Sequence, residues 1–594
     1  MHCEPVRTRT GQDSKRATDD EFALRKLACQ RRESMRQARF KSWVGGIALL
    51  GGWASLAVAA SPPAAREQLE PPVQLPAFTV RDSRVLPARE SWRYASAPGL
   101  EVLSTASASE TSRLFKDFLE FHRAVNAIWP LMEMNASVPA CLILCDRARQ
   151  FAPFVPARDQ ALAHNMVSVS YQDRELSSIA IDLDAAAQAP ATDEAAPDLS
   201  QYSADLVHRE YVHFLLQRLG ERVPPWLEQG LWQLFLGIKT SGDLIGLPAL
   251  SLPDEVPQRK QGAPAALAAA VQGGTFYALP ELFGSPHDAS ELDHSPWAHE
   301  CYEFVHFCLF GANGKYRRAF FQFAQLASRV PADEAMFRQC FETGYPDFLA
   351  QLWRYTDWSE DRGFQLTSPA TGKAAPLPTP LVRAATDGEV GRIKGEALRM
   401  AGRQEQAHWT LIAPFQRGSR DPQLLAALGL QEAEAHLPER ALPFLEAAAA
   451  LHTTRARAWA TLAQLRLDAA LKQPAGAGRT LSVDQLQSIL EPLFAARALA
   501  PPLPEVYRIA AAAWSRSEVK PTAGHLAVVD QGVARFPYDT DLICADAELQ
   551  LKFGYRERAQ AICAFGARYA VAPADRARIA ALQRTLAAPG AGAP

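Results

Sequence analysis

The sequence repeats itself every 34 residues in its C-terminal third. Gly395, Gly429 and Ala463 are separated by that period, and each stands in a run rich in Ala and Leu. Small side chains at fixed offsets let two antiparallel helices approach closely, and one such pair cannot bury its apolar face alone. Neighbouring pairs must therefore stack, so the period predicts an all-α solenoid of about five units over residues 385–590.

This C-terminal region resembles the tetratricopeptide repeat (TPR) family. The pair Leu428-Gly429 recurs as Leu462-Ala463, and Ala407 and Ala441 keep one offset from Gly395 and Gly429. Several aromatic and proline positions of the family's consensus are missing, so an unrelated α-solenoid stays as the alternative. The resemblance implies a concave surface that binds a peptide or a partner protein.

The N-terminal segment predicts export. From Met35 the chain reads MRQARFK, then SWVGGIALLGGWASLAVA, which ends in small residues. A positive segment, an apolar core and a small-residue cleavage pattern are typical of a secretory signal peptide. We predict that 1–34 is a non-native extension, that 35–59 is the signal peptide, and that the protein is exported to the periplasm or cell envelope of a bacterium. The alternative, an uncleaved anchor over 42–60, is the only membrane contact that the sequence suggests.

Charge and cysteine content argue against two further classes of protein. The chain carries 62 Lys and Arg against 65 Asp and Glu, a formal net charge of -3. This balance does not favour a nucleic-acid partner. The cysteines after the signal are odd in number and form no CxxC pair, which argues against a disulfide scaffold or a thiolate zinc site. Cys544 and Cys563 are the candidate disulfide pair, although a buried free thiol is the commoner state.

The residues between the signal and the repeats predict a mixed α and β region. Pro-rich composition predicts linkers at 60–90 and 361–384. Between them, periodicity predicts strands and helices at 109–129, 140–145, 167–171, 179–183, 203–219, 297–310 and 316–327. We therefore predict an α+β fold class in which 91–360 contains a small α/β lobe and a helical lobe, followed by the all-α solenoid.

One segment, at 203–236, suggests chemistry. A zinc-peptidase helix needs His-Glu-x-x-His, because two imidazoles four residues apart can bind one Zn²⁺ while the Glu acts as general base. Here the segment reads Arg209-Glu210-Tyr-Val-His213, so the first ligand position holds a cation that would repel the metal ion. The adjacent His208 cannot replace it, because on a regular helix it points about 140° away from His213.

Two further segments carry a resemblance to peptidases. The sequence PWLEQGL from Pro225 is similar to the second zinc-ligand helix of gluzincins, and AHECYEFVHFCLFG from Ala298 resembles the helix behind their active site. More narrowly, 91–360 resembles the peptidase MA-like domain of unknown function in exported bacterial proteins. In that family the Glu before the Gly is the third zinc ligand; here Gln229 holds this position, and Glu228 lies one residue early.

Two functions from different classes follow. The first is an exported interaction protein with an inactive metallopeptidase-like domain, no cofactor, and an array that holds a protein or peptide on its concave surface. The alternative is an active zinc metallopeptidase of the cell envelope, in which Glu210 is the base, His213 and Glu228 are ligands and the repeats present the substrate. A second metal site is less favoured. Its candidate ligands lie in or near an apolar helix, where histidines are more often structural: His294, His299 and His306.

Overall fold

The structure is a computed structural model that describes the following residues: 86, 88–129, 140–159, 166–187, 199–217, 223–241, 244–247, 264–273, 276–284, 295–359, 364–367, 380–472, 480–570 and 572–587. The chain divides into two compact units, Met1–Pro72 and Val73–Pro594, and all described residues lie in the second. The predicted extension at 1–34, the signal peptide at 35–59 and the anchor at 42–60 therefore lie outside the described residues. Within the described ranges, no helix is long and apolar enough to cross a membrane.

A six-stranded sheet lies at the centre of the N-terminal region, with the strand order β4-β5-β3-β2-β1-β9. Neighbours β2, β3 and β5 run parallel, whereas β4, β1 and β9 join antiparallel. The strands of this sheet are β1 Arg93–Ala97, β2 Leu100–Ser104, β3 Ala140–Cys145, β4 Ser168–Gln172, β5 Ser177–Asp182 and β9 Arg383–Ala384. A second sheet has the order β6-β7-β8 and consists of Lys239–Ser241, Leu244–Leu247 and Phe364–Thr367.

The central strands of the six-stranded sheet are buried on both faces. Alternate residues of a strand point to opposite faces, and in β3 Leu142 belongs to one apolar cluster while Ile143 belongs to another. All six residues of β3 and of β5 are buried. This is why the sequence there is a continuous apolar run, as expected for parallel strands covered on two sides.

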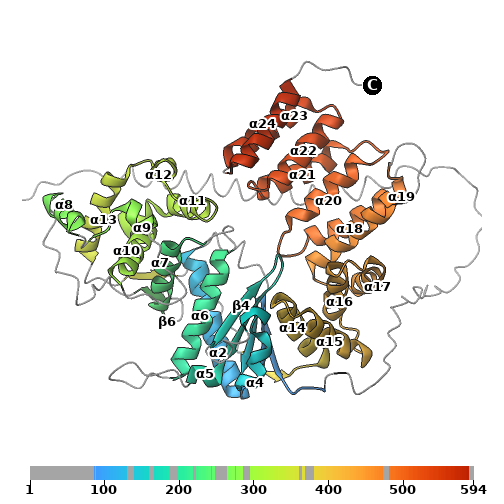
Figure 1. Ribbon diagram of the computed structural model, residues 1–594, viewed down its shortest axis with the longest axis horizontal. Helices are drawn as coiled ribbons and strands as arrows, with labels where there is room; N and C mark the ends of the chain where they lie inside the picture. Colours follow the sequence, from blue (N-terminus) through green and yellow to red (C-terminus); the bar gives the residue numbers. More distant parts are fainter. Residues whose placement is uncertain are drawn as a thin grey trace, which may run out of the picture. The chain divides into compact units, whose positions relative to one another are not determined.

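Helices from two distant parts of the chain cover these faces. α2 (Ala108–Ile128) and α6 (Leu199–Gln217) lie on one side of the sheet, and α14 (Asp387–Met400) lies on the other (Figure 1). α14 is the first helix of the predicted repeat array, and its Val390 and Ile393 pack in the same cluster as Ile143. The array therefore supplies one of the layers that bury the sheet.

The remaining elements before residue 360 are mainly helical, as predicted. They are α4 Ala148–Phe151, η3 Ala152–Phe154, α5 Leu183–Ala187, α7 Pro225–Leu236, α8 Pro264–Gln272, α9 Leu279–Gly284, α10 Pro296–Phe310, η5 Gly311–Gly314, α11 Arg317–Ala327, α12 Glu334–Phe341 and α13 Tyr345–Ser359. α7 and α10 pack so closely that a Cβ on Gly230 would lie 2.5 Å from the Cys301 carbonyl oxygen. The glycine of the PWLEQGL segment is thus required by packing.

The C-terminal region is a TPR-like array of helix pairs. Among the described residues, α14 to α23 form five consecutive pairs, followed by α24. The remaining bounds are α15 Gln404–Gln416, α16 Pro422–Glu434, α17 Pro438–Ala450, α18 Ala456–Lys472, α19 Val483–Arg497, α20 Pro504–Ser515, α21 Ala523–Arg535, α22 Thr540–Lys552, α23 Arg556–Tyr569 and α24 Pro573–Ala587. The described cysteines, Cys544 and Cys563 included, are buried and form no disulfide with one another.

The segment 361–384, expected to be a linker, contributes strands to both sheets. β8 (Phe364–Thr367) pairs with β7, and β9 (Arg383–Ala384) pairs with β1. Runs of four and two residues are too short to show an alternating pattern, so composition dominated the prediction. The strand β9 therefore joins the sheet immediately before the repeat array begins.

The small residues of the 34-residue period stand where paired helices touch, and this generates a stability prediction. A Cβ on Gly429 would lie 2.7 Å from Leu445 Cγ, whereas a Cβ on Gly524 would meet nothing nearer than 3.7 Å. Thermal and denaturant unfolding should show Gly429→Ala to be destabilised by about 1–3 kcal/mol, because the helix pair must separate. The matched Gly524→Ala should be neutral or stabilising, because alanine favours helix. Equal effects would contradict this account of the repeat.

Candidate functional site

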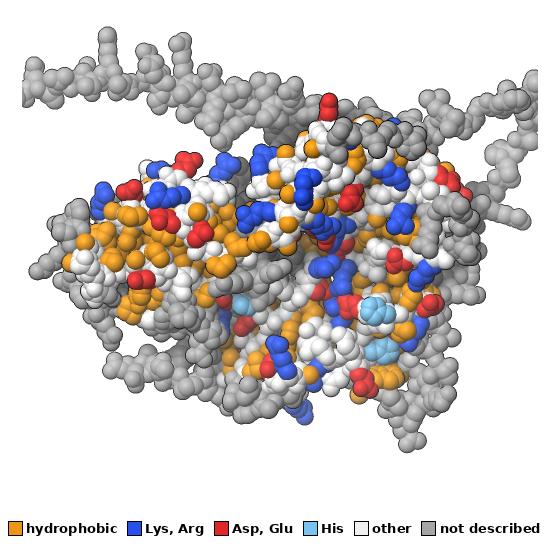
Figure 2. All heavy atoms as spheres, turned by 45° about the horizontal axis from the view of Figure 1, so that its top comes forward, with side chains coloured by type: hydrophobic (Ala, Val, Ile, Leu, Met, Phe, Trp, Pro, Cys, Tyr) orange, Lys and Arg blue, Asp and Glu red, His pale blue; other side chains and the backbone are white. Residues whose placement is uncertain are grey.

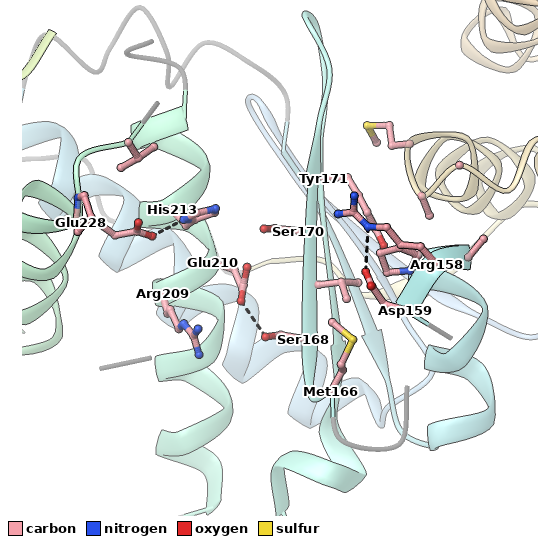
Figure 3. Close-up of a pocket in the computed structure, with 18 residues that line it drawn as sticks. Arg158, Asp159, Met166, Ser168, Ser170, Tyr171, Arg209, Glu210, His213 and Glu228 are labelled. Atoms are coloured by element: carbon pink, nitrogen blue, oxygen red, sulfur yellow. Dashed lines mark hydrogen bonds and ion pairs between the residues drawn. The ribbon is translucent and has the colours of Figure 1, made fainter. Parts of the chain in front are cut away.

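The residues of the incomplete zinc motif lie around one cavity between α6, α7 and β4. The cavity has a volume of about 970 Å³, and we call it the sheet-edge pocket. Its walls include Ser168–Tyr171 of β4, Arg209, Glu210 and His213 of α6, Glu228 of α7, the loop Pro156–Asp159, and Met400–Gly402 at the end of α14. Figure 3 shows Glu210 and His213 on α6 facing Ser168 and Ser170 on β4 across this pocket.

His213 and Glu228 form a close pair at one end of the sheet-edge pocket. The Nδ1 atom of His213 is hydrogen-bonded to Oε1 of Glu228. Burial alone would lower the pKa of His213, but the hydrogen bond and the charge of Glu228 raise it above its usual value. The pair therefore behaves as an ion pair whose strength grows as the pH falls.

Glu210, the predicted general base, is also engaged by a neighbour. The Ser168 hydroxyl donates a hydrogen bond of 2.9 Å to Oε1 of Glu210 (Figure 3). Sequence analysis did not single out Ser168 or Ser170. The alternation of the segment VSVSY carried the signal, because it places both serines on one face of β4.

The two positions that depart from the zinc-peptidase pattern take structural roles. The guanidinium carbon of Arg209 lies 4.6 Å from the centre of the Trp232 ring, a cation–π contact with α7. Gln229 is fully buried and does not line the pocket. Within the described residues, no group of three or more His, Cys, Asp or Glu side chains is arranged to hold a metal ion.

This donor set does not fit a zinc site. Zinc in a peptidase is held by three protein ligands and a water. The sheet-edge pocket offers one imidazole, His213, whose Nδ1 already meets Glu228, and it places the cation of Arg209 beside them. The structure thus brings Glu210, His213 and Glu228 together, while their roles in metal binding stay predictions.

The other histidines near this region are packed as structural groups. His208 stacks on Phe121, with ring centres 3.8 Å apart, and its Nε2 lies 2.9 Å from Asp117. It therefore belongs to the α2 side of α6, as its helical position predicted. His306 is fully buried and hydrogen-bonded to the Tyr355 hydroxyl at 2.8 Å, and burial lowers the pKa of His306 to about 3. His299 is buried as well, and His294 lies outside the described residues.

Strand β4 presents an open edge to the pocket. It is the first strand of the sheet and pairs only with β5 among the described strands. Asp182 N–H donates to Val167 C=O, and Asp173 N–H donates to Leu176 C=O. In an antiparallel ladder every second residue bonds to the partner strand. The backbone groups of Ser168 and Ser170 therefore point away from β5, toward the edge.

The turn between β4 and β5 is inserted into the repeat array. Glu175 is 1% exposed and accepts hydrogen bonds of 2.8 Å from Arg455 Nε and from the Arg457 backbone N–H. Arg455 also donates to Glu396 of α14 at 2.7 Å. Asp173 accepts from Arg457 Nη1 at 2.9 Å and from Arg399. We call these residues the turn network: Asp173, Glu175, Glu396, Arg399, Arg455 and Arg457.

Opposite charges face one another in the turn network. Burial raises the pKa of Glu175, although Arg455 acts to lower it. Burial alone would raise the pKa of Asp173, but Arg399 and Arg457 hold it well below its usual value. Burial alone would lower the pKa of Arg455, but the Glu175 and Glu396 carboxylates raise it. Each of these buried charges thus has a partner of opposite sign, which its burial requires.

The chain's own turn narrows the surface that the array offers to partners. Beyond the turn remains a cavity of about 1080 Å³, which we call the array pocket. It is lined by Gln172–Arg174, by Arg329, and by residues at the starts of α20 and α22. Charged side chains of both signs gather in the middle of the face that Figure 2 shows. The array pocket therefore lies directly beside the turn network.

Comparisons with known proteins leave the family open. No protein-family model matches the chain, and no curated protein matches it. Among solved structures, a thermophilic TPR protein from Thermus thermophilus is similar at 18% identity, over 33% of this chain and 97% of that chain, with a TM-score of 0.24. Our description of the array rests instead on its helix pairs and 34-residue period. The resemblance to a peptidase MA-like domain stays a prediction.

The His213–Glu228 pair generates a pH prediction. Because the folded-state pKa of His213 is raised, the pair stabilises the protein fully below the unfolded pKa of about 6.5, and less as the pH rises through the folded value. Glu228→Gln should therefore lower the free energy of unfolding more at acidic than at alkaline pH, by about 1 kcal/mol or less, since His213 is partly exposed. Glu281→Gln, which removes an exposed carboxylate, should show no such difference. A pH-independent loss in Glu228→Gln would contradict the ion pair.

Proposed function

We propose that this protein binds an extended segment of another protein in the sheet-edge pocket. The observation that carries the proposal is the open edge of β4, which runs along the wall of a cavity large enough for several residues. A peptide in extended conformation would add a strand to the sheet by pairing with the outward backbone groups of Ser168 and Ser170. Main-chain hydrogen bonds would supply affinity for many sequences.

The side chains opposite β4 would give this binding its selectivity. α6 places the cation of Arg209, the carboxylate of Glu210 and the imidazole of His213 along the same pocket. These groups would bind polar side chains or a charged end of the peptide, since each is partly or wholly desolvated there. In this proposal the domain is an inactive relative of metallopeptidases that keeps a peptide cleft without the metal chemistry.

The array extends the proposal to a folded protein partner. A TPR-like helical array suggests protein binding, and the array pocket, beside the β4–β5 turn, is the cavity that we assign to this binding. Export to the bacterial periplasm or envelope is proposed from the signal-like segment at 35–59. The protein would then capture its partner in that compartment.

Two substitutions at one position test the edge-strand proposal. Peptides should first be selected from a random dodecapeptide phage library, and the best one should be synthesised with a fluorescent label. Ser170→Pro removes the outward N–H without removing a bond to β5, and should weaken binding of this peptide roughly tenfold, as one lost hydrogen bond and a clash with the incoming strand predict. Ser170→Ala keeps the N–H and should bind normally. Normal binding by Ser170→Pro, or failure to select any peptide, would overturn the proposal.

Zinc content and peptide cleavage distinguish our proposal from the alternative function, an active zinc metallopeptidase. In our proposal, protein purified without metal-affinity steps and incubated with zinc should contain far less than one zinc ion per chain by mass spectrometry, because the described residues of the pocket do not supply three ligands. Glu210→Gln should leave peptides uncleaved, as the parent protein does. Near one zinc per chain, with cleavage that Glu210→Gln and a chelator both abolish, would establish the peptidase and refute our proposal.

A further inference from the structure

We infer that the repeat array holds the β4–β5 turn as a permanent internal ligand, and that Glu175 and Arg455 are positioning residues for the sheet-edge pocket. This inference rests on the proposed peptide binding and adds to it the means by which the receiving strand is kept in place. Its starting point is that the array holds the end of β4 at this turn through buried ionic groups.

The turn directly continues the strand that would receive the peptide. β4 ends at Gln172, and the turn network begins at the next residue, Asp173. Asp173 Oδ1 also accepts hydrogen bonds of 2.8 Å from the backbone N–H groups of Glu175 and Leu176, which fixes the shape of the turn. A rigid turn anchored at both acidic residues transmits its position to β4 within a few residues.

The array also builds part of the pocket wall itself. Met400–Gly402, at the end of α14, line the sheet-edge pocket. Directly after them, Arg403 donates two hydrogen bonds, of 2.8 and 3.0 Å, to the Val155 carbonyl group, and this holds the adjoining Pro156–Asp159 wall. The distance between the wall and β4 is therefore set by the array at two separate points.

The charges of the turn network make this arrangement specific. Glu175 and Arg455 are 1% and 5% exposed, so the removal of either charge breaks a buried ion pair and leaves Arg455 with Glu396 alone, or Glu175 without its arginine. A surface contact would tolerate such a change. The turn is held in this one position because here its two acidic residues meet Arg399, Arg455 and Arg457 together.

The test compares two buried glutamates in the full-length chain. Glu175→Gln disrupts the turn network, whereas Glu432→Gln removes an equally buried carboxylate whose partners, His408 and Arg440, both belong to the array. Amide hydrogen exchange by mass spectrometry should show roughly tenfold faster exchange over Ser168–Gln172 in Glu175→Gln only. The labelled library peptide should bind Glu175→Gln roughly tenfold more weakly at a temperature where both variants are folded.

The outcomes separate this inference from the proposed function. Unchanged exchange in β4 of Glu175→Gln, or equal changes in both variants, would overturn the positioning role even if the parent protein binds the peptide. Faster exchange in β4 of a protein that binds no peptide would leave the role standing and remove the proposed function. If Glu175→Gln does not fold, Arg457→Gln tests the anchoring of the same turn through Asp173, because the Arg457 side chain is less buried and contacts Asp173 rather than Glu175.

Discussion

The packing of α14 against the second face of the sheet is the constraint on which the rest of the structure depends. A sheet whose central strands are apolar on both sides must be covered twice. α2 and α6 cover one face, and Val390, Ile393 and Ala397 of α14 cover the other. An ion pair reinforces this packing, because Arg392 of α14 meets Glu101 of β2 at 2.5 and 3.0 Å. Burial alone would raise the pKa of Glu101, but Arg392 lowers it to about 2.

This packing changes how the two regions relate to each other. In a separable pair of domains the repeat array would bring its own stability and its own binding surface. Here the first helix of the array is a layer of the α/β region, and the inner side of α14 and α18 holds a turn of that region. The array therefore completes the sheet and part of the wall of the sheet-edge pocket.

Contacts between side chains connect the walls of the sheet-edge pocket. Arg209 stacks on Trp232, and Glu228 pairs with His213, so these side chains link α6 to α7. Ser168 ties α6 to β4 through Glu210. The pocket keeps its shape by these direct contacts.

Sequence patterns predicted those features that depend on neighbours along the chain. Continuous apolar runs predicted β3 and β5, and the 34-residue period predicted the helix pairs, since both signals are local. The role of α14 was not predictable, because an apolar stripe looks the same whether it faces a repeat or a sheet. The contact between Glu175 and Arg455 spans 280 residues, and no sequence pattern near either residue indicates it.

The residues of the candidate site were predicted from the sequence, but their surroundings were not. The incomplete zinc motif indicated Glu210, His213 and Glu228, and the structure places them in one pocket. The pattern gave no sign that the pocket lies against an open strand edge, because edge position depends on the order of strands in the sheet. Only the pairing of β4 with β5 alone, among the described strands, revealed it.

The most direct test of the account is residue-resolved amide hydrogen exchange of β4 with and without a saturating selected peptide. The account predicts that Ser168 and Ser170, whose N–H groups point to the open edge, become strongly protected when the peptide binds. Val169 and Tyr171 should change little, because their N–H groups already bond to β5. Protection confined to the array, or none in β4, would contradict the claim that this strand receives the peptide.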